Sequence, residues 1–160
     1  MKQGVKEKIF STIISGGQTG VDRAALDVAL ELDREAGGWC PRGRRAEDGK
    51  ISSRYPLQET ASWKYPVRTR KNVQQSDGTL ILTRGEPKGG TALTAALAEQ
   101  LKKPYRVVDL EAEKEGTDVL RGWGRELAIQ VLNVAGPRES EAPGIYEQAT
   151  RFLKKLLAEN

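Results

Sequence analysis

A strand, a glycine-rich turn and a helix follow one another near the start of the chain, and this succession constrains the fold more than any other feature. Residues 9–14 (IFSTII) are short, β-branched and almost continuously apolar, as in a strand buried on both faces. The next six residues, 15–20 (SGGQTG), include three glycines. From Val21 the apolar residues recur at helical spacing, and we expect that helix to end at Gly37 and Gly38. The sequence therefore predicts bare backbone where a strand gives way to a helix.

Strands and helices alternate along the rest of the chain. The expected strands are 38–40, 78–82, 105–108 and 131–135, and the expected helices are 92–102, 117–129 and 144–158. This alternation favours an α/β, Rossmann-like, doubly wound fold, with a mostly parallel sheet of about five strands and helices on both faces. A length of 160 residues indicates a single ligand-binding domain, 1–160, in which we expect residues 1–7 to form a flexible tail.

Residues 41–77 form a polar, basic insert between the second and third expected strands. The insert contains nine Lys or Arg residues and four Asp or Glu residues, whereas the whole chain has a net charge of only +4. Two prolines break regular structure within it, so we expect only short helices, near 57–61 and 69–75. The local excess of positive charge indicates an anionic partner, and the arginines of the insert, among them Arg42 and Arg68, are candidates to contact it.

The residue types that the chain lacks exclude several classes of site. The chain has no histidine, which removes Ser-His-Asp and Cys-His catalysis and most catalytic zinc sites. Its single cysteine, Cys40, cannot form a disulfide within the chain, and the sequence does not decide whether its thiol is reactive. We therefore predict no directly bound metal. No apolar run approaches the roughly 20 residues that a membrane span needs, and no secretion signal is visible, so we expect a cytoplasmic protein without membrane contact.

Two glycine-rich stretches, SGGQTG at 15–20 and KGGT at 88–91, adjoin the starts of expected helices. In a doubly wound sheet, ligands bind beyond the carboxyl ends of the strands, and the unpaired N–H groups of a helix start attract anions. Neither stretch matches the dinucleotide fingerprint or the Walker A loop. We expect both to bind a phosphate or a similar anion, and Thr91 to cap the second helix. The ligand-binding candidates in the two stretches are Gly16, Gly17, Gln18, Thr19, Gly20, Gly89, Gly90 and Thr91.

Two polar residues at the first stretch could recognise the rest of a ligand. Gln18 can both donate and accept hydrogen bonds, which suits the edge of a base or a pterin. Asp22, in the first turn of the expected helix, could accept from a ligand N–H or hydroxyl, or could simply interact with the helix dipole. Asp22 is also the one weak candidate for a catalytic acid or base.

Five segments together carry a resemblance to a known family. The segments are GGQTGVDRAALDVA, GGWCPRGRRAEDGKI, YPVRTRKNVQQSDGTLIL, KGGT and LNVAGPRES. They resemble the "putative molybdenum carrier" family, a circularly permuted branch of the lysine-decarboxylase-like (LOG-like) Rossmann superfamily. The resemblance covers nearly the whole chain, from about Lys8 to Leu157. It implies a pocket formed by 16–20, Asp22 and 89–91, and it adds the pair Arg68–Thr69 as a further motif.

The resemblance implies one main function and one alternative. The main function is that of a carrier that binds molybdenum cofactor (molybdopterin), an anionic phosphorylated pterin, without chemical turnover. The alternative is a nucleotide-processing hydrolase or a sensor of a nucleotide-derived ligand, as in other members of the superfamily. Analogy with the superfamily also implies a homo-oligomer. Nucleic acid is an unlikely partner, because the basic residues are not repeated along a helix and no known nucleic-acid-binding motif is visible.

One departure from the superfamily weakens the hydrolase alternative. The hydrolytic relatives carry the pattern PGGxGTxxE, and in this sequence Thr94 stands where their glutamate would be. A threonine cannot act as a carboxylate base or stabilise an oxocarbenium-like state. We therefore expect a binding protein more than an enzyme.

Overall fold

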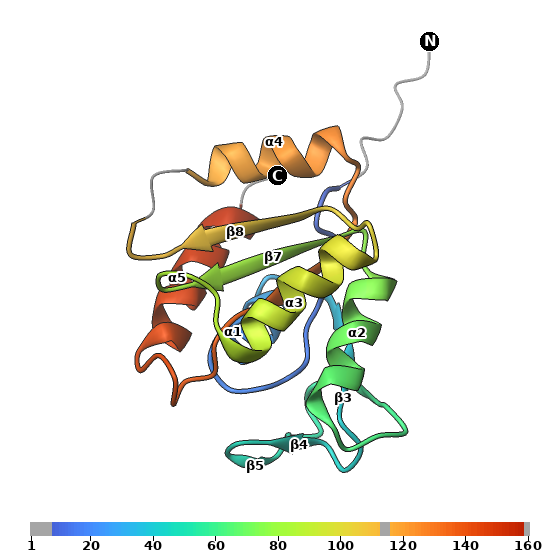
Figure 1. Ribbon diagram of the computed structural model, residues 1–160. Coiled ribbons are helices and arrows are strands. Elements are labelled where there is room, and N and C mark those ends of the chain that lie inside the picture. The colour runs from blue at the N-terminus through green and yellow to red at the C-terminus, as the bar shows by residue number, and fades with distance from the viewer. Residues whose placement is uncertain (1–7, 113–115, 159–160) are drawn as a thin grey trace.

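Five parallel strands form the central sheet of the protein (Figure 1). The computed structural model describes residues 8–112 and 116–158, and the predicted tail 1–7 lies outside them. The order across the sheet is β2-β1-β9-β7-β8, and every neighbouring pair is parallel. The strands are β1 (Thr12–Ile14), β2 (Glu35–Gly37), β7 (Gly78–Thr83), β8 (Tyr105–Asp109) and β9 (Val131–Ala135).

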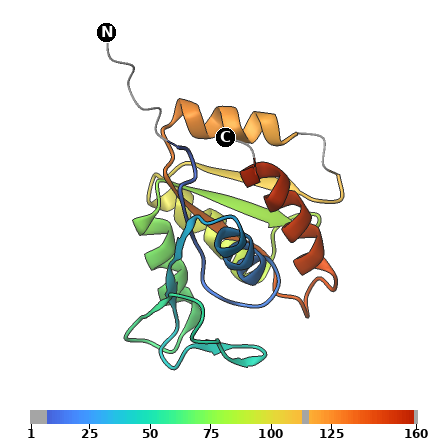
Figure 2. The ribbon, with the colours of Figure 1, turned by 180° about the vertical axis from the view of Figure 1, so that it is seen from behind.

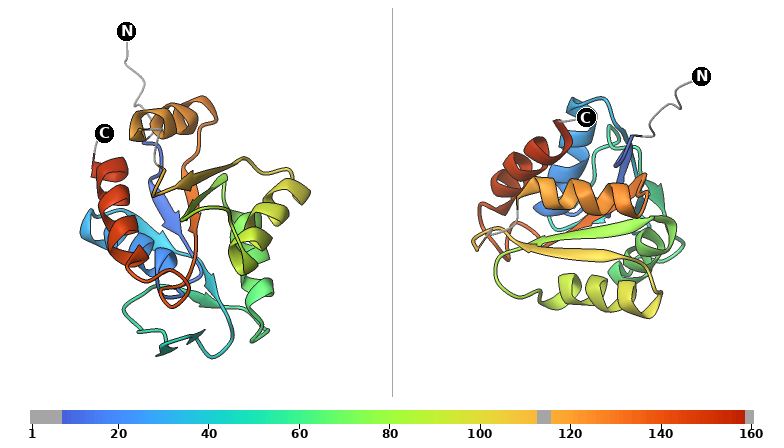
Figure 3. Two further views of the ribbon diagram at one scale, coloured as in Figure 1. Left: turned by 60° about the vertical axis from the view of Figure 1, so that its left-hand side comes forward. Right: turned by 90° about the horizontal axis from the view of Figure 1, so that it is seen from above.

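Helices cover both faces of this sheet (Figures 2 and 3). On one face lie α1 (Val21–Glu31), α4 (Thr117–Glu126) and α5 (Ile145–Ala158), and on the other lie α2 (Tyr65–Gln75) and α3 (Gly89–Gln100). The predicted doubly wound α/β fold is therefore confirmed. Among the described residues, no helix is both long enough and apolar enough to cross a membrane.

The larger hydrophobic core lies between the sheet and the layer of α1, α4 and α5. Ile13, Leu80 and Leu132 point from the strands into this core and are almost completely buried, as is Leu153 of α5. A smaller cluster on the opposite face joins Val73 of α2 to α3. All six residues of β7 are buried, because helices cover both faces of this strand.

The order of the strands places a crevice at the middle of the sheet. After β1 the chain runs outward to the edge strand β2, and after β7 it runs to the opposite edge strand β8. The last strand, β9, then fills the space between β1 and β7. Ligands of open α/β sheets bind where the strand order reverses, outside the carboxyl ends of the strands. Here that position is the carboxyl end of β1, β9 and β7.

The second strand of the sheet differs from the prediction. Helix α1 ends at Glu31, not at Gly37–Gly38, because the chain turns at Asp33, which has a φ of 57°. The edge strand β2 is Glu35–Gly37, and the predicted strand 38–40 instead contains β3 (Trp39–Cys40) of a separate two-stranded sheet. A polar, half-exposed edge strand lacks the apolar run by which buried strands are found in a sequence.

The insert 41–77 folds as short strands and one longer helix. The predicted helix at 57–61 is wrong, because Gln58–Glu59 forms β6, which pairs with β3. Strands β4 (Arg45–Ala46) and β5 (Gly49–Lys50) form a hairpin, which lies at the lower edge of Figure 1. The predicted helix at 69–75 exists as α2 but begins at Tyr65. A small apolar cluster holds the insert against α1; its members are Leu26, Cys40, Ala46, Ile51, Tyr55 and Leu57.

The buried amide of Asn72 attaches α2 to β3, and this contact yields a test of the fold. Its Oδ1 accepts from the backbone N–H of Trp39 at 2.8 Å, and its Nδ2 donates to the Trp39 carbonyl at 3.0 Å. We expect Asn72→Ala to lower the free energy of unfolding by about 2 kcal/mol, because two hydrogen bonds are lost and their partners are left unpaired. Urea denaturation measures the loss. The exposed Gln74 of the same helix provides the control, and equal stability of Asn72→Ala and Gln74→Ala would contradict the role of this amide.

Candidate functional site

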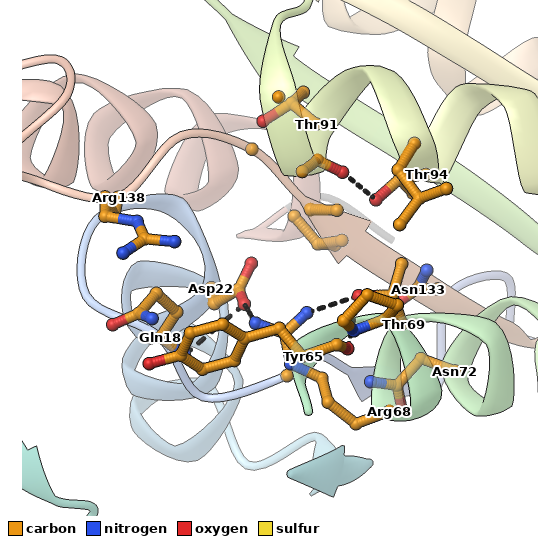
Figure 4. Close-up of a pocket in the computed structure, with 18 of the residues that line it drawn as sticks. Gln18, Asp22, Tyr65, Arg68, Thr69, Asn72, Thr91, Thr94, Asn133 and Arg138 are labelled. Atoms are coloured by element: carbon orange, nitrogen blue, oxygen red, sulfur yellow. Dashed lines mark hydrogen bonds and ion pairs between the residues drawn. The ribbon is translucent and has the colours of Figure 1, made fainter. Parts of the chain in front are cut away.

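A cavity of about 290 Å³ opens at the carboxyl ends of β1 and β9 (Figure 4). Helix α2 forms one wall, and the first turn of α3 forms another. The two glycine-rich stretches, far apart in the sequence, meet in this cavity because β9 holds β1 and β7 one strand apart. Of the residues predicted from the sequence to contact a ligand, those that line the cavity are Gly16, Gln18, Asp22, Arg68, Thr69, Gly89, Gly90 and Thr91.

Four predicted ligand residues lie elsewhere. Gly17, with a φ of 79°, packs where a Cβ would come within 2.6 Å of Leu57, and Gly20, with a φ of 78°, faces the carbonyl of Pro137. The Thr19 hydroxyl bonds to the Glu47 carboxylate and accepts from the backbone of the 136–144 loop. Arg42 is exposed and does not line the cavity. Gly17 and Gly20 therefore allow close packing within the protein, and Thr19 and Gly20 line a second cavity beside Arg23.

Three backbone amides of the first glycine stretch are paired with nearby side chains. The N–H of Gln18 donates to Oδ2 of Asp22 at 3.3 Å, and the N–H of Thr19 donates to Oε1 of Gln18 at 3.1 Å. The N–H of Gly17 donates to the Ser15 hydroxyl at 3.3 Å. The amides of Gly17, Gln18 and Thr19 are consequently not free, unlike those expected of an open helix start.

The start of α3, in contrast, is open. The amides of Gly89 and Gly90 make no hydrogen bond to the described residues, and a Cβ at either position would meet nothing within 4 Å. Thr91 is the third residue of the helix and not its cap, because α3 begins at Gly89 with Lys88 as an N-cap that makes no side-chain bond. Free N–H groups at a helix start favour an anion. The second glycine stretch therefore has the geometry that was predicted for both.

Asp22 and Arg68 form a buried pair on the opposite side of the cavity. Oδ2 of Asp22 lies 4.0 Å from Nη2 of Arg68, and the two side chains are 6% and 13% exposed. Burial raises the pKa of Asp22 to about 6, although the nearby Arg68 and the backbone N–H of Gln18 oppose this rise. Burial likewise lowers the pKa of Arg68, against the attraction of Asp22. Gly16 makes this arrangement possible, because a Cβ there would come within 2.6 Å of Arg68.

Two buried donors at the cavity lack an acceptor among residues 8–112 and 116–158. They are Nε2 of Gln18 and Nε of Arg68. The Arg68 guanidinium donates from Nη1 to the Thr69 hydroxyl at 2.6 Å, whereas its Nε has no partner among the described residues. An unpaired buried donor costs free energy that an acceptor on a ligand would recover.

Tyr65 gathers three arginines at the cavity. The guanidinium carbons of Arg45, Arg68 and Arg138 lie 4.2, 5.3 and 5.4 Å from the centre of its ring. Attraction between cations and the ring face holds these charges close together without neutralising them. The three arginines come from β4, α2 and the loop after β9. Carboxylates offset part of their charge, because Arg68 lies 4.0 Å from Asp22 and Arg138 lies 3.7 Å from Glu141.

Several residues that line the cavity were not predicted from the sequence to contact a ligand, including Tyr65, Asn133 and Arg138. Tyr65 was placed in an irregular segment because the start of α2 was predicted four residues too late. Asn133 was one polar residue inside an apolar strand, which is a usable signal, because such a residue at a strand's carboxyl half often faces a ligand site. For Arg138, the signal is its place in LNVAGPRES, one of the five segments that carry the family resemblance.

A family model and a solved structure match this chain. The model of the circularly permuted YpsA SLOG family matches residues 13–157. The chain belongs to this family. The crystal structure of a "Putative molybdenum carrier protein" from Syntrophus aciditrophicus SB is similar over 96% of this chain and 99% of the other, with 46% identity and a TM-score of 0.91. Among curated proteins, no match was found. The resemblance inferred from the sequence is thus confirmed.

Two further observations bear on the chemistry open to this SLOG family member: the environment of its single cysteine, and the grouping of possible metal ligands. Cys40 is completely buried in the apolar cluster of the insert, and burial raises the pKa of its thiol, so it is not poised as a nucleophile. Within 8–112 and 116–158, no three His, Cys, Asp or Glu residues are grouped so that they could hold a metal ion.

The raised pKa of Asp22 predicts a pH-dependent stability. Between pH 4 and pH 6 the folded protein keeps a proton on Asp22 that the unfolded chain has released, so the contribution of Asp22 to stability falls as the pH rises through this range. Asn cannot titrate. We therefore expect the free energy of unfolding of Asp22→Asn, relative to the wild type, to increase by about 3 kcal/mol between pH 4 and pH 8.

Urea denaturation at a series of pH values and constant ionic strength measures this difference. A difference that stayed level from pH 4 to pH 8 would show that the Asp22 carboxyl is not desolvated in the folded protein.

Proposed function

We propose that the protein binds a phosphorylated small molecule with a planar ring and carries it without chemical turnover, and that this ligand is molybdenum cofactor. The observation that carries the proposal is the convergence, in one cavity, of an open helix start with two buried donors that lack acceptors. The name given to the Syntrophus relative, which shares 46% of its residues with this chain, points in the same direction.

The phosphate fits best at the start of α3. Gly89 and Gly90 offer free amides there, and the dipole of the twelve-residue helix adds partial positive charge. Arg138 lines the same cavity, 3.7 Å from Glu141, and the arginines gathered around Tyr65 favour an anion there. A volume of about 290 Å³ lies at the lower end for small-molecule sites, which suits one ring system and one phosphate more than a dinucleotide.

The ring would lie on the side of the cavity formed by α1 and α2. Gln18 and Arg68 present their unpaired donors there, and Asp22 and Asn133 present oxygen atoms. A metal bound to such a ligand would be held by the ligand's own donor atoms, because the described residues supply no cluster of protein ligands. The residues present therefore fit a phosphorylated pterin.

A carrier fits the site better than a hydrolase. The chain has no histidine, and Thr94, which stands in place of the glutamate of the hydrolytic relatives, donates its hydroxyl to the Gly90 carbonyl at 3.0 Å. That hydroxyl is tied to its own helix, so it offers no base beside a bound ligand.

Gentle purification from the source organism followed by native mass spectrometry tests the proposal. We expect a mass increment that corresponds to a phosphorylated pterin, with or without molybdenum. The same spectrum counts the subunits and so tests the predicted homo-oligomer. Protein that carries no small molecule, and that fails to bind isolated molybdenum cofactor in titration calorimetry, would refute the carrier function.

A pair of glycine substitutions tests the role of the α3 start. Gly90 and Gly122 both lie in helices, neither has a positive φ, and a Cβ at either would meet nothing within 4 Å. We expect Gly90→Leu and Gly122→Leu to fold equally well, since both replace a helical glycine. Only Gly90→Leu fills space in the cavity, so it should weaken binding of a phosphorylated pterin such as neopterin monophosphate by about tenfold or more. Equal binding by both variants would show that the phosphate does not bind at the start of α3.

The protonation of Asp22 favours a second candidate function, hydrolysis of a nucleotide. A buried carboxyl with a pKa of about 6 in a ligand cavity can act as a general acid near neutral pH. This candidate predicts release of base or phosphate from a nucleoside monophosphate, lost in Asp22→Asn. Chromatography of a nucleotide panel incubated with the protein measures the release, and no release from the wild type would rule the candidate out.

A further inference from the structure

The orientation of the Gln18 amide is fixed from outside the cavity. Its Oε1 accepts from the backbone N–H of Glu47 at 2.8 Å and from that of Thr19 at 3.1 Å. Both are donors, so the oxygen must face them, and the Nε2 group must face the other way. The side chain is 95% buried, as its residue is only 5% exposed, and Nε2 has no partner in the described protein. Within the described protein, the one hydrogen-bonding group of the Gln18 side chain without a partner is therefore a donor, Nε2.

An acceptor, the carboxylate of Asp22, lines the same cavity as Gln18. The carboxylate of Asp22 is within 3.3 Å of the Gln18 backbone nitrogen, and both side chains line the cavity. Figure 4 shows them on the same wall, with Arg68 from α2 nearby. The unpaired Nε of Arg68 adds a second donor. This wall thus offers hydrogen-bond donors next to a hydrogen-bond acceptor.

We propose that Gln18 and Asp22 recognise the lactam edge of the ligand ring, in which a carbonyl oxygen stands next to a ring N–H. The carbonyl accepts from Nε2 of Gln18, with Nε of Arg68 as a second donor, and the ring N–H donates to Asp22. Guanine, hypoxanthine, uracil and pterins carry this edge, whereas adenine and cytosine present an amino group and an unprotonated ring nitrogen instead. The inference rests on the proposed function, because it assigns the ring end of the same ligand.

A second anionic group would fit this wall poorly. Asp22 is buried beside Arg68 and balances much of its charge, so an additional anion would meet the Asp22 carboxylate at short range. An amino edge would also fit poorly, because its N–H₂ would face the N–H₂ of Gln18 and leave both donors unpaired. A neutral carbonyl next to an N–H satisfies all of these groups together.

Wild-type protein suffices for the first test. Titration calorimetry measures the affinity for each probe. GMP is compared with AMP and UMP with CMP, and neopterin monophosphate serves as the pterin probe. We expect GMP and UMP to bind at least about tenfold more tightly than AMP and CMP, because a mismatched edge leaves buried donors unpaired. Comparison of GMP with neopterin monophosphate then distinguishes a purine from a pterin as the bearer of the edge.

The variant Gln18→Glu tests the residue itself. Glutamate keeps an oxygen for the backbone N–H groups of Glu47 and Thr19 but replaces the donor Nε2 by an acceptor. We expect the preference for GMP over AMP to fall about tenfold or more, to unity or below. Gln74→Glu makes the same change in charge on the exposed face of α2 and should leave the preference unchanged.

The outcomes separate the two proposals. Equal binding of the oxo and amino partners by the wild type, or an unchanged preference in a folded Gln18→Glu, would overturn the lactam inference while leaving a phosphate-binding carrier intact. If the wild type binds none of the five phosphorylated probes, both the proposed function and this inference are refuted. If Gln18→Glu fails to fold, the wild-type comparison alone decides.

Discussion

The site depends on the insertion of the last strand, β9, between β1 and β7. This one placement closes the sheet at its centre and brings the carboxyl ends of strands from both halves of the chain to the same point. The turn after β1 and the start of α3 then face each other across a cavity, although about 70 residues separate them in the sequence. The placement of β9 is therefore what gives the two glycine stretches a common cavity.

The two glycine stretches look alike as sequence and have different physical roles. At 89–91 the glycines leave free amides next to open space, as an anion site requires. At 15–20 the glycines make room for Arg68, Leu57 and the Pro137 carbonyl, and the amides bond to neighbouring side chains. A glycine-rich turn in a sequence indicates a close approach of backbone, but it does not say whether a ligand or the protein itself makes that approach.

Much of the fold could be predicted because the buried strands and the amphipathic helices have strong periodicity. The strands at β7, β8 and β9 and the helix α5 were found close to their observed bounds. The edge strand β2 and the strands of the insert are short, polar or half-exposed, and their conformation is set by tertiary contacts such as the amide of Asn72. Among the site residues, motif positions such as Gln18 and Asp22 were predicted, whereas Tyr65 and Arg138 reach the cavity only through the packing of α2 and the 136–144 loop.

The β4–β5 hairpin positions residues around the cavity through hydrogen bonds, although its own residues do not line it. Through Glu47 it holds the Gln18 amide, the Thr19 hydroxyl and the Ser140 hydroxyl, and through Asp48 it holds Arg23 with two bonds of 3.1 Å. The hairpin thus sets the direction of a recognition group that it does not itself contain. Because the group of Glu47 that donates to Gln18 is its backbone N–H, the direction of the Gln18 amide depends on the length and conformation of the exposed hairpin, and not on which side chain stands at position 47.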